Sequence, residues 1–143
     1  MTTPFDAAND AARARLVAFV RGLSDDDLRR PAPYGGTVAA LLAHLAFWDR
    51  RVTVLLARWT AGGVDEAPVD ANMINDAQAP ILAALPPRDA AELCLAAAAE
   101  AEAAVAALSP ELIAAIEASG VFMRLDRSLH RLGHLEALAA ATK

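Results

Sequence analysis

The stretch that decides the fold is TVAALLAHLAFWDRRVTVLLARWT, residues 37–60. Its large apolar side chains recur every three or four positions, which is the period of one helix face: Leu41, Leu45, Trp48, Val52, Leu55, Leu56 and Trp59. Thr37 is a suitable N-cap, because its hydroxyl can accept a hydrogen bond from a free amide of the first turn, and Gly62-Gly63 supply the stop. The pattern predicts one long amphipathic helix with a face in a core.

Helix-breaking residues divide the rest of the chain into further helical segments. The breakers are Gly22, the loop Pro31–Gly36, Pro86-Pro87 and Gly120. Between them the pattern predicts helices over about 6–21, 71–85, 88–108, 110–119 and 122–140, with a short turn capped by Ser24. We expect a single all-α domain over residues 1–143, an up-down-type four-helix bundle with extra short helices.

Composition and charge narrow the function classes. The 143 residues are 56% hydrophobic but only 5% aromatic, and the formal net charge is −5. Because no run of Lys or Arg is present, we do not expect nucleic acid as a partner. Residues 1–5 lack the basic start of a signal peptide, and no apolar run approaches the roughly 20 residues of a membrane span. We therefore expect a cytoplasmic protein that binds a small molecule and no membrane.

The lone cysteine, Cys94, excludes an intramolecular disulfide and a multi-thiolate metal site. It stands in the alanine-rich segment ELCLA, residues 92–96. These surroundings indicate a buried apolar filler and not a reactive thiol.

Three histidines are the strongest candidates for chemistry. His130 and His134 are four residues apart in the predicted last helix, so their Cβ atoms lie on one face, about 5–6 Å apart. His44 lies in the 37–60 helix. If the two helices are neighbours, the imidazoles can hold a divalent metal such as Zn²⁺, Ni²⁺ or Fe²⁺, with positions left open for water or substrate. The alternative is that each histidine is an ordinary core or boundary residue.

Two carboxylates stand close to these histidines in the sequence. Asp126 precedes His130 by one turn, and Asp49 follows His44 by five residues. Either carboxylate could accept a hydrogen bond from the second ring nitrogen of an imidazole and so orient it. A solvated surface charge is the other interpretation of both. No residue is assigned a catalytic role at this point.

The predicted last helix has two faces that compete for one core. Leu125, Leu129 and Leu132 cluster on one side, whereas His130 and His134 lie about 100–180° away. In one solution the histidines face the bundle with Met123 and Ala137, and the leucines pack on another element or a second subunit. In the other, the leucines fill the core and the histidines lie at a groove edge or in water. The first solution predicts a homodimer.

The order of these features resembles a known family. The matching parts are the loop 31–37, the segment LLAHLAFWD at 41–49 and the late segment HRLGHLE at 130–136. They resemble the DinB-like superfamily of four-helix bundles, which includes the N-terminal domains of mycothiol-dependent maleylpyruvate isomerases. The resemblance implies that His44, His130 and His134 are the ligands of a divalent metal.

The resemblance also implies a range of activities. Some relatives use a low-molecular-weight thiol whose sulfur is activated by the metal, and others are described as hydrolases. We therefore expect a thiol-dependent transferase or isomerase, or a metal-assisted hydrolase, in which a bound water or an external thiol is the nucleophile. The alternative is a metal-free bundle that binds or sequesters a small apolar ligand or a partner protein. Because imidazole binds metal only when neutral, we expect metal loss as the pH falls through about 6 to 5.

Overall fold

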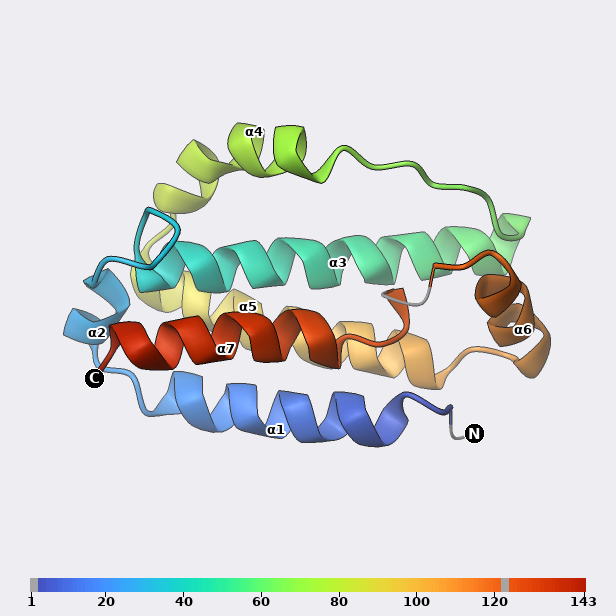
Figure 1. The fold of residues 1–143 in the computed structure, drawn as a ribbon, viewed down its shortest axis with the longest axis horizontal. Coiled ribbons are helices and arrows are strands. Elements are labelled where there is room, and N and C mark those ends of the chain that lie inside the picture. Colours follow the sequence, from blue (N-terminus) through green and yellow to red (C-terminus); the bar gives the residue numbers. More distant parts are fainter. Residues whose placement is uncertain (1–2, 122–123) are drawn as a thin grey trace.

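The computed structural model describes residues 3–121 and 124–143, and these residues form α-helices and no β-strand (Figure 1). The helices are α1 (Asp6–Arg21), α2 (Asp25–Arg29), α3 (Val38–Gly62), α4 (Ala71–Ala83), α5 (Pro87–Ala106), α6 (Pro110–Ala118) and α7 (Ser128–Ala141). α1, α3, α5 and α7 form the bundle, and α2, α4 and α6 are the additional shorter segments (Figure 1). The predicted all-α bundle is confirmed.

The four bundle helices form two pairs that run in opposite directions (Figure 1). α4 carries the chain back along the outside of α3, so α3 and α5 run the same way, whereas α1 and α7 run the opposite way (Figure 1). α3 packs most extensively against α5, and α1 contacts both α5 and α7. The contact between α3 and α7 is much smaller than that between α3 and α5. This seam lies beside α4, and it is where the candidate site forms.

Three helix starts have side-chain caps, including those that the sequence indicated at Ser24 and Thr37. Ser24 and Asp27 form a reciprocal capping box at α2. The Thr37 hydroxyl accepts a hydrogen bond from the amide of Ala40 at 3.1 Å, and the Ser109 hydroxyl accepts one from the amide of Leu112 at 3.2 Å. Each cap satisfies a first-turn amide that has no partner inside its helix. The cap at Thr37 fixes where α3 begins and therefore where its side chains point.

The interior consists of two apolar clusters. One gathers side chains of α1, the first half of α3, the first half of α5 and the end of α7, including Leu16, Leu42, Cys94 and Leu138. The other gathers the second half of α3 with α6 and the segments beside it, including Leu56, Trp59, Ile116 and Leu125. Leu41 and Trp48, which the pattern placed in the core stripe, are only half-buried and line a cavity instead.

The last helix begins later than predicted. It starts at Ser128 and not near Phe122, a residue that lies with Met123 outside the described part of the chain. Leu125 therefore precedes the helix, where it is fully buried, whereas Leu129 is 63% exposed. The predicted leucine stripe does not exist as one face, because its first member is not helical. The core face of α7 is instead formed by Arg131, Leu135 and Leu138.

No helix among the described residues is both long enough and apolar enough to cross a membrane.

Candidate metal centre

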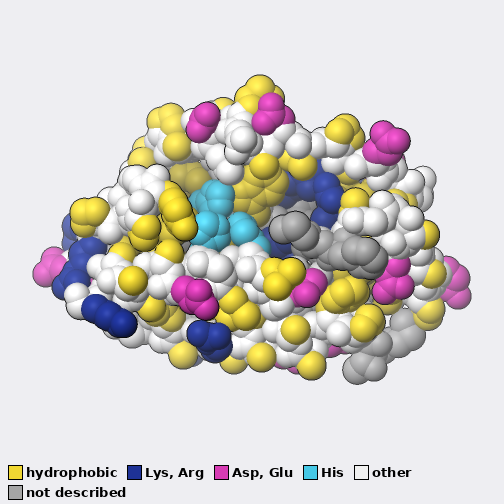
Figure 2. Space-filling model, in the orientation of Figure 1, with side chains coloured by type: hydrophobic (Ala, Val, Ile, Leu, Met, Phe, Trp, Pro, Cys, Tyr) yellow, Lys and Arg dark blue, Asp and Glu magenta, His cyan; other side chains and the backbone are white. Residues whose placement is uncertain are grey.

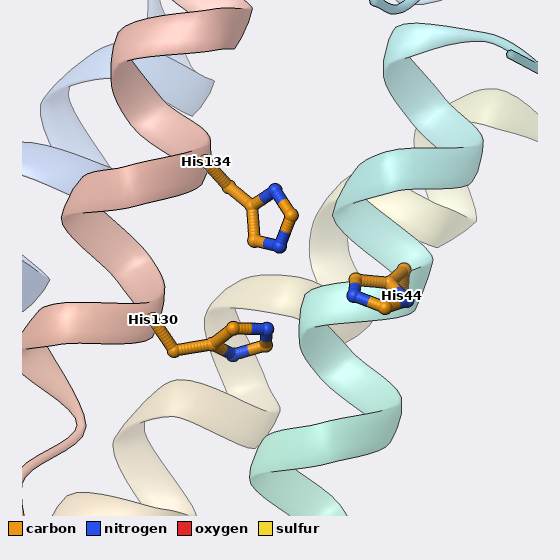
Figure 3. A group of neighbouring side chains, drawn as sticks. All are labelled: His44, His130 and His134. Carbon is orange, nitrogen blue, oxygen red and sulfur yellow. The ribbon is translucent and has the colours of Figure 1, made fainter. Parts of the chain in front are cut away.

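The three histidines project into the seam between α3 and α7. His44 comes from the second turn of α3, and His130 and His134 come from successive turns of α7. Their rings point toward one another across the gap between the two helices (Figure 3). The arrangement that the sequence made conditional on neighbouring helices is therefore present, and the histidines face the bundle.

The ring positions fit a single small cation. The ring centroids of His44 are 5.6 Å from those of His130 and 5.2 Å from those of His134, and the two α7 rings are 4.9 Å apart. One nitrogen from each ring can be chosen so that all three lie within 4.8 Å of one another. Tetrahedral Zn²⁺ with bonds of about 2.0–2.1 Å needs nitrogens roughly 3.4 Å apart. Small rotations of the rings about their side-chain torsions close this difference.

Burial keeps all three imidazoles in the form that binds metal. Burial, reinforced by the nearby His134, lowers the pKa of His44 to about 4. Burial, followed by the charge of Arg127, lowers the pKa of His130 to about 3. Burial also lowers the pKa of His134. At neutral pH each ring therefore has a nitrogen lone pair available, and no proton has to be displaced from an imidazolium.

The polar groups that touch the rings are donors. The Nε2 atom of Gln78 lies 3.5 Å from Nδ1 of His44, and Nη2 of Arg127 lies 3.4 Å from Nδ1 of His130. Because a guanidinium can only donate, Nδ1 of neutral His130 is the acceptor in this contact, so a metal bound by this ring would replace Arg127 at Nδ1 or bind Nε2 of the other tautomer. Gln78 also donates to Oδ1 of Asn75 at 3.0 Å, and Asn75 accepts from the Trp48 indole at 2.9 Å. α4 is thus attached to the site by a chain of side-chain hydrogen bonds.

The structure gives the two carboxylates partners other than the imidazoles. Asp126 precedes α7 and accepts hydrogen bonds from the amide of Ser128, at 3.1 Å, and from its hydroxyl. Asp49 is only 1% exposed, so the surface interpretation is wrong for this residue. Its Oδ1 atom accepts from Nε of Arg127 at 2.8 Å. Asp49 is therefore connected to His130 indirectly, through Arg127.

The histidines lie in a cavity of about 850 Å³ between α3, α4 and the start of α7. Its walls include Leu41, Trp48 and Leu82, and Tyr34 lies edge-on to His134 at its mouth with a centroid distance of 6.3 Å. Figure 2 shows the histidine rings in this hollow, with hydrophobic side chains beside them and arginines further along. The cavity is large enough for a small organic molecule in contact with the three rings.

A group of buried polar residues that the sequence did not predict lies next to the histidines. Arg131 is fully buried, with its Nη2 atom 3.5 Å from Oδ2 of Asp49 and its Nη1 atom 3.4 Å from Oε2 of Glu102. Its guanidinium also donates to the backbone oxygens of Ala98, at 3.1 Å, and Asn9, at 3.3 Å. One arginine thus connects α7 to α1, α3 and α5.

Asn9 extends this network to the segment that leads into α7. Its side chain donates to the carbonyl of Leu125 at 2.8 Å and accepts from the amide of Arg127 at 2.8 Å. The signal in the sequence was a polar residue at a core position. Asn9 continues the buried stripe of α1 through Ala12 and Leu16, and Asp49 lies between the core residues Leu45 and Val52 of α3.

Cys94 is fully buried in the core of the bundle. Burial raises the pKa of its thiol to about 12, so it stays protonated and unreactive at neutral pH. The prediction of a buried apolar filler is confirmed.

Comparison with known proteins identifies one family. A family model described as the mycothiol maleylpyruvate isomerase N-terminal domain matches residues 10–115. The match includes His44 but ends before His130 and His134, so the convergence of all three rings rests on the structure. No curated protein and no solved structure matches the chain.

Proposed function

Because the chain belongs to the mycothiol maleylpyruvate isomerase N-terminal domain family, we propose that it is a metal-dependent enzyme whose divalent ion is bound by His44, His130 and His134. The observation that carries the proposal is the convergence of three neutral imidazoles from two helices in one open cavity. Imidazole donors suit Zn²⁺, Ni²⁺ or Fe²⁺. Three protein ligands leave a position for water or substrate, as catalytic sites require.

The reaction class that we propose is thiol-dependent transfer or isomerisation. Metal-assisted hydrolysis is the alternative reaction class. When bound, the ion would lower the pKa of a coordinated thiol or water and polarise a carbonyl. The protein's own side chains would bind the ion and orient the imidazole rings. The histidines present neutral nitrogens, Gln78 contacts His44, and Arg127 contacts His130. The apolar wall around Leu41, Trp48 and Leu82 reduces the access of water to a bound substrate.

The competing function is a metal-free protein that binds a small apolar ligand. The apolar wall of the same cavity favours it, because such a wall would bind an apolar molecule without a metal. In this function the histidines serve only as polar lining. The two functions differ in one measurable quantity, the metal content of the protein.

Elemental analysis of protein purified without an affinity tag tests the proposal. We expect about one divalent ion per chain in the parent, and loss of that ion in His44→Ala, His130→Ala and His134→Ala. Glu136→Gln is the matched control, because Glu136 is an exposed residue on the same helix as two of the ligands. Metal that persists in the three histidine variants, or a parent that binds none when loaded with Zn²⁺, Ni²⁺ or Fe²⁺, would exclude the proposed centre.

A second measurement separates the two reaction classes. In protein loaded with Co²⁺, titration with N-acetylcysteine should produce a sulfur-to-metal charge-transfer absorption if a thiol is the natural co-substrate. We expect this band in the parent and in Glu136→Gln. Loaded protein that shows no band but hydrolyses ester or amide substrates would favour the hydrolase.

A further inference from the structure

Two rows of side chains lead from the histidines along the cavity. On α3, His44, Trp48 and Arg51 follow at intervals of four and three residues, so they share one helix face. On the other side of the seam, His130 is preceded by Arg127 and Arg124 at intervals of three. All of these residues line the same cavity. Its histidine end therefore continues into an end lined by arginines, with Trp48 between the two.

Arg51 and Arg124 meet at one backbone oxygen. Nη2 of Arg51 lies 3.4 Å, and Nη2 of Arg124 lies 3.2 Å, from the carbonyl oxygen of Ala67. Each guanidinium also lies over an aromatic ring, Arg51 over Trp48 at 5.9 Å and Arg124 over Trp59 at 6.0 Å. The planes and positions of both cations are therefore constrained by groups that carry no negative charge.

Neither of these two cations forms an ion pair in the part of the chain that the structure describes. The buried Nε atom of Arg124 also has no hydrogen-bond partner among the described residues. Arg127 differs, because Asp49 pairs with it at 2.8 Å. Two half-buried guanidiniums that share a neutral acceptor repel each other, and the repulsion falls when an anion lies between them.

The pKa shifts agree with this geometry. Burial, followed by the charge of Arg127, lowers the pKa of Arg51. Burial, followed by the charges of Arg51 and Arg127, also lowers the pKa of Arg124, and the charge of Asp65 partly offsets this shift. Both groups remain charged at neutral pH, since an arginine starts from a very high value. The protein therefore keeps two close cations at this end of the cavity.

The backbone at Ala67 is held in an unusual conformation. Its φ is 40°, and among the described residues it is the only non-glycine residue with a positive φ. An alanine with a positive φ costs conformational energy. Such residues persist where the surrounding structure fixes the backbone, and they cluster at ligand-binding and active sites. Here the strained residue places its carbonyl where the two guanidiniums meet.

We propose that Arg51 and Arg124 bind the carboxylate of an elongated small molecule whose other end lies at the three histidines. Planar guanidiniums match a carboxylate through paired hydrogen bonds, and Trp48 supplies an apolar surface for the middle of the ligand. Arg51 follows His44 by seven positions on α3, which corresponds to about 10 Å along the helix axis. The ligand class is thus an aryl- or alkyl-carboxylate of about this length. The inference extends the proposed function by naming its substrate class.

Two matched probes test the carboxylate site by calorimetry. 4-Phenylbutyrate carries the carboxylate, and 4-phenylbutanamide is its uncharged analogue. We expect the parent to bind the carboxylate at least about tenfold more tightly than the amide, and the difference to shrink when salt is raised. Equal affinity for both probes, or no binding of the carboxylate at millimolar concentration, would overturn the proposal. This comparison needs no variant and so does not depend on the folding of one.

Variants then locate the site. Arg51→Gln and Arg124→Gln should each remove most of the preference for the carboxylate. Arg58→Gln is the matched control, because Arg58 is an exposed arginine on α3 outside this cavity, and its preference should equal that of the parent. A preference that survives in the double variant Arg51→Gln/Arg124→Gln would place the anion elsewhere and overturn the proposal.

Repeating the titration after chelation distinguishes this inference from the metal proposal. The arginines should keep the preference for the carboxylate in EDTA-treated protein and in His44→Ala. A preference that disappears with the metal would show that the carboxylate binds the ion, which overturns the arginine site but supports the metal centre. A preference that persists in protein without any metal supports the arginine site even if the metal centre fails.

Discussion

His130 and Arg131 are neighbours on α7, yet they occupy opposite kinds of environment. His130 is half-buried, faces an open cavity and is kept neutral by a pKa of about 3. Arg131 is fully buried, cationic, and bonded to groups from three other helices. The difference shows how the bundle divides two tasks. Charged groups hold α7 in place, and neutral groups next to them remain available to a ligand.

The buried charges specify position more than they add stability. Removing a guanidinium and a carboxylate from water costs several kcal/mol, roughly what their attraction returns. Their value lies in geometry, because Arg131 reaches Asp49, Glu102 and Ala98 only in one register of α7. A sliding or rotation of α7 that moved the histidines would also break these bonds. The network is therefore expected to set the alignment of His130 and His134 with His44.

The largest expected effect comes from removing the acid at the centre of the network. Asp49→Ala removes the carboxylate that pairs with Arg127 and one of the two carboxylates that pair with Arg131. We expect the free energy of unfolding to fall by about 3–5 kcal/mol, because the substitution breaks a buried ion pair while its cation stays in the interior. Urea denaturation measures the change. The control is Arg50→Ala, at the position next to Asp49. It breaks an exposed ion pair with Glu100 and should lower the free energy of unfolding by less than about 1 kcal/mol.

Equal losses in Asp49→Ala and Arg50→Ala would contradict the distinction between the two kinds of charge. A loss in Asp49→Ala with unchanged metal affinity would contradict the role of the network in aligning the histidines. Both quantities should change together if α7 depends on Asp49 for its position.

The fold was largely predictable because its signals are local. The apolar period and the cap at Thr37 are properties of one segment, and they locate α3 without knowledge of any other part of the chain. The pairing of His130 with His134 is local in the same sense, since two residues four positions apart on a helix share a face. What the sequence could not supply was the neighbour of each helix, and so the meeting of His44 with the other two was conditional.

The partners of Asp49 could not be predicted because they come from distant parts of the chain. Arg127 is 78 residues away from it in the sequence. The start of α7 was misplaced for the same reason. Asn9 binds the carbonyl of Leu125 and the amide of Arg127, so the backbone there makes tertiary hydrogen bonds in place of helical ones. Periodicity detects helices, but it does not detect a polar side chain that competes for the backbone.

A smaller effect is expected from the other end of the network. Asn9→Ala removes the partners of one buried carbonyl and one buried amide. We expect a loss of about 2–4 kcal/mol in the free energy of unfolding, because each orphaned group costs about 1–3 kcal/mol. Asn72→Ala, at an exposed position of α4, should change stability by no more than about 0.5 kcal/mol. Comparable values for the two variants would show that the Asn9 bonds do not hold the entry to α7.

The neutral histidines of the cavity predict that the stability of the folded protein depends on pH. The histidines have pKa values of about 4 and about 3 at His44 and His130, against about 6.5 in the unfolded chain. As the pH falls from about 6.5 toward 4, the unfolded state binds protons that the folded state does not, so stability falls. We expect this in chelated protein by thermal unfolding, with a shallower slope in His130→Ala. A slope unchanged by that substitution would contradict the assignment.

The same lowered pKa values shift the pH at which we expect the metal to be released to lower pH. Ordinary imidazoles would lose it between about pH 6 and 5. Because folded His44 and His130 are protonated only near pH 4 and 3, protons compete with a bound ion at lower pH. Metal retention followed by dialysis across pH should therefore extend below 5. Complete loss above pH 6 would contradict the lowered values.

The smallest effect is expected on the third face of α7, which neither network nor cavity uses. Leu129 is 63% exposed, and Leu132 is only partly buried against the core. Leu129→Lys should therefore change the free energy of unfolding by no more than about 0.5 kcal/mol, measured in urea. This face is also the one that the sequence assigned to a homodimer, which stays a prediction. Sedimentation equilibrium tests this prediction, because a dimer that uses Leu129 would dissociate in the variant. A parent that is already monomeric would contradict the dimer. It would leave the comparison between His130 and Arg131 unchanged, because both residues contact groups of their own chain.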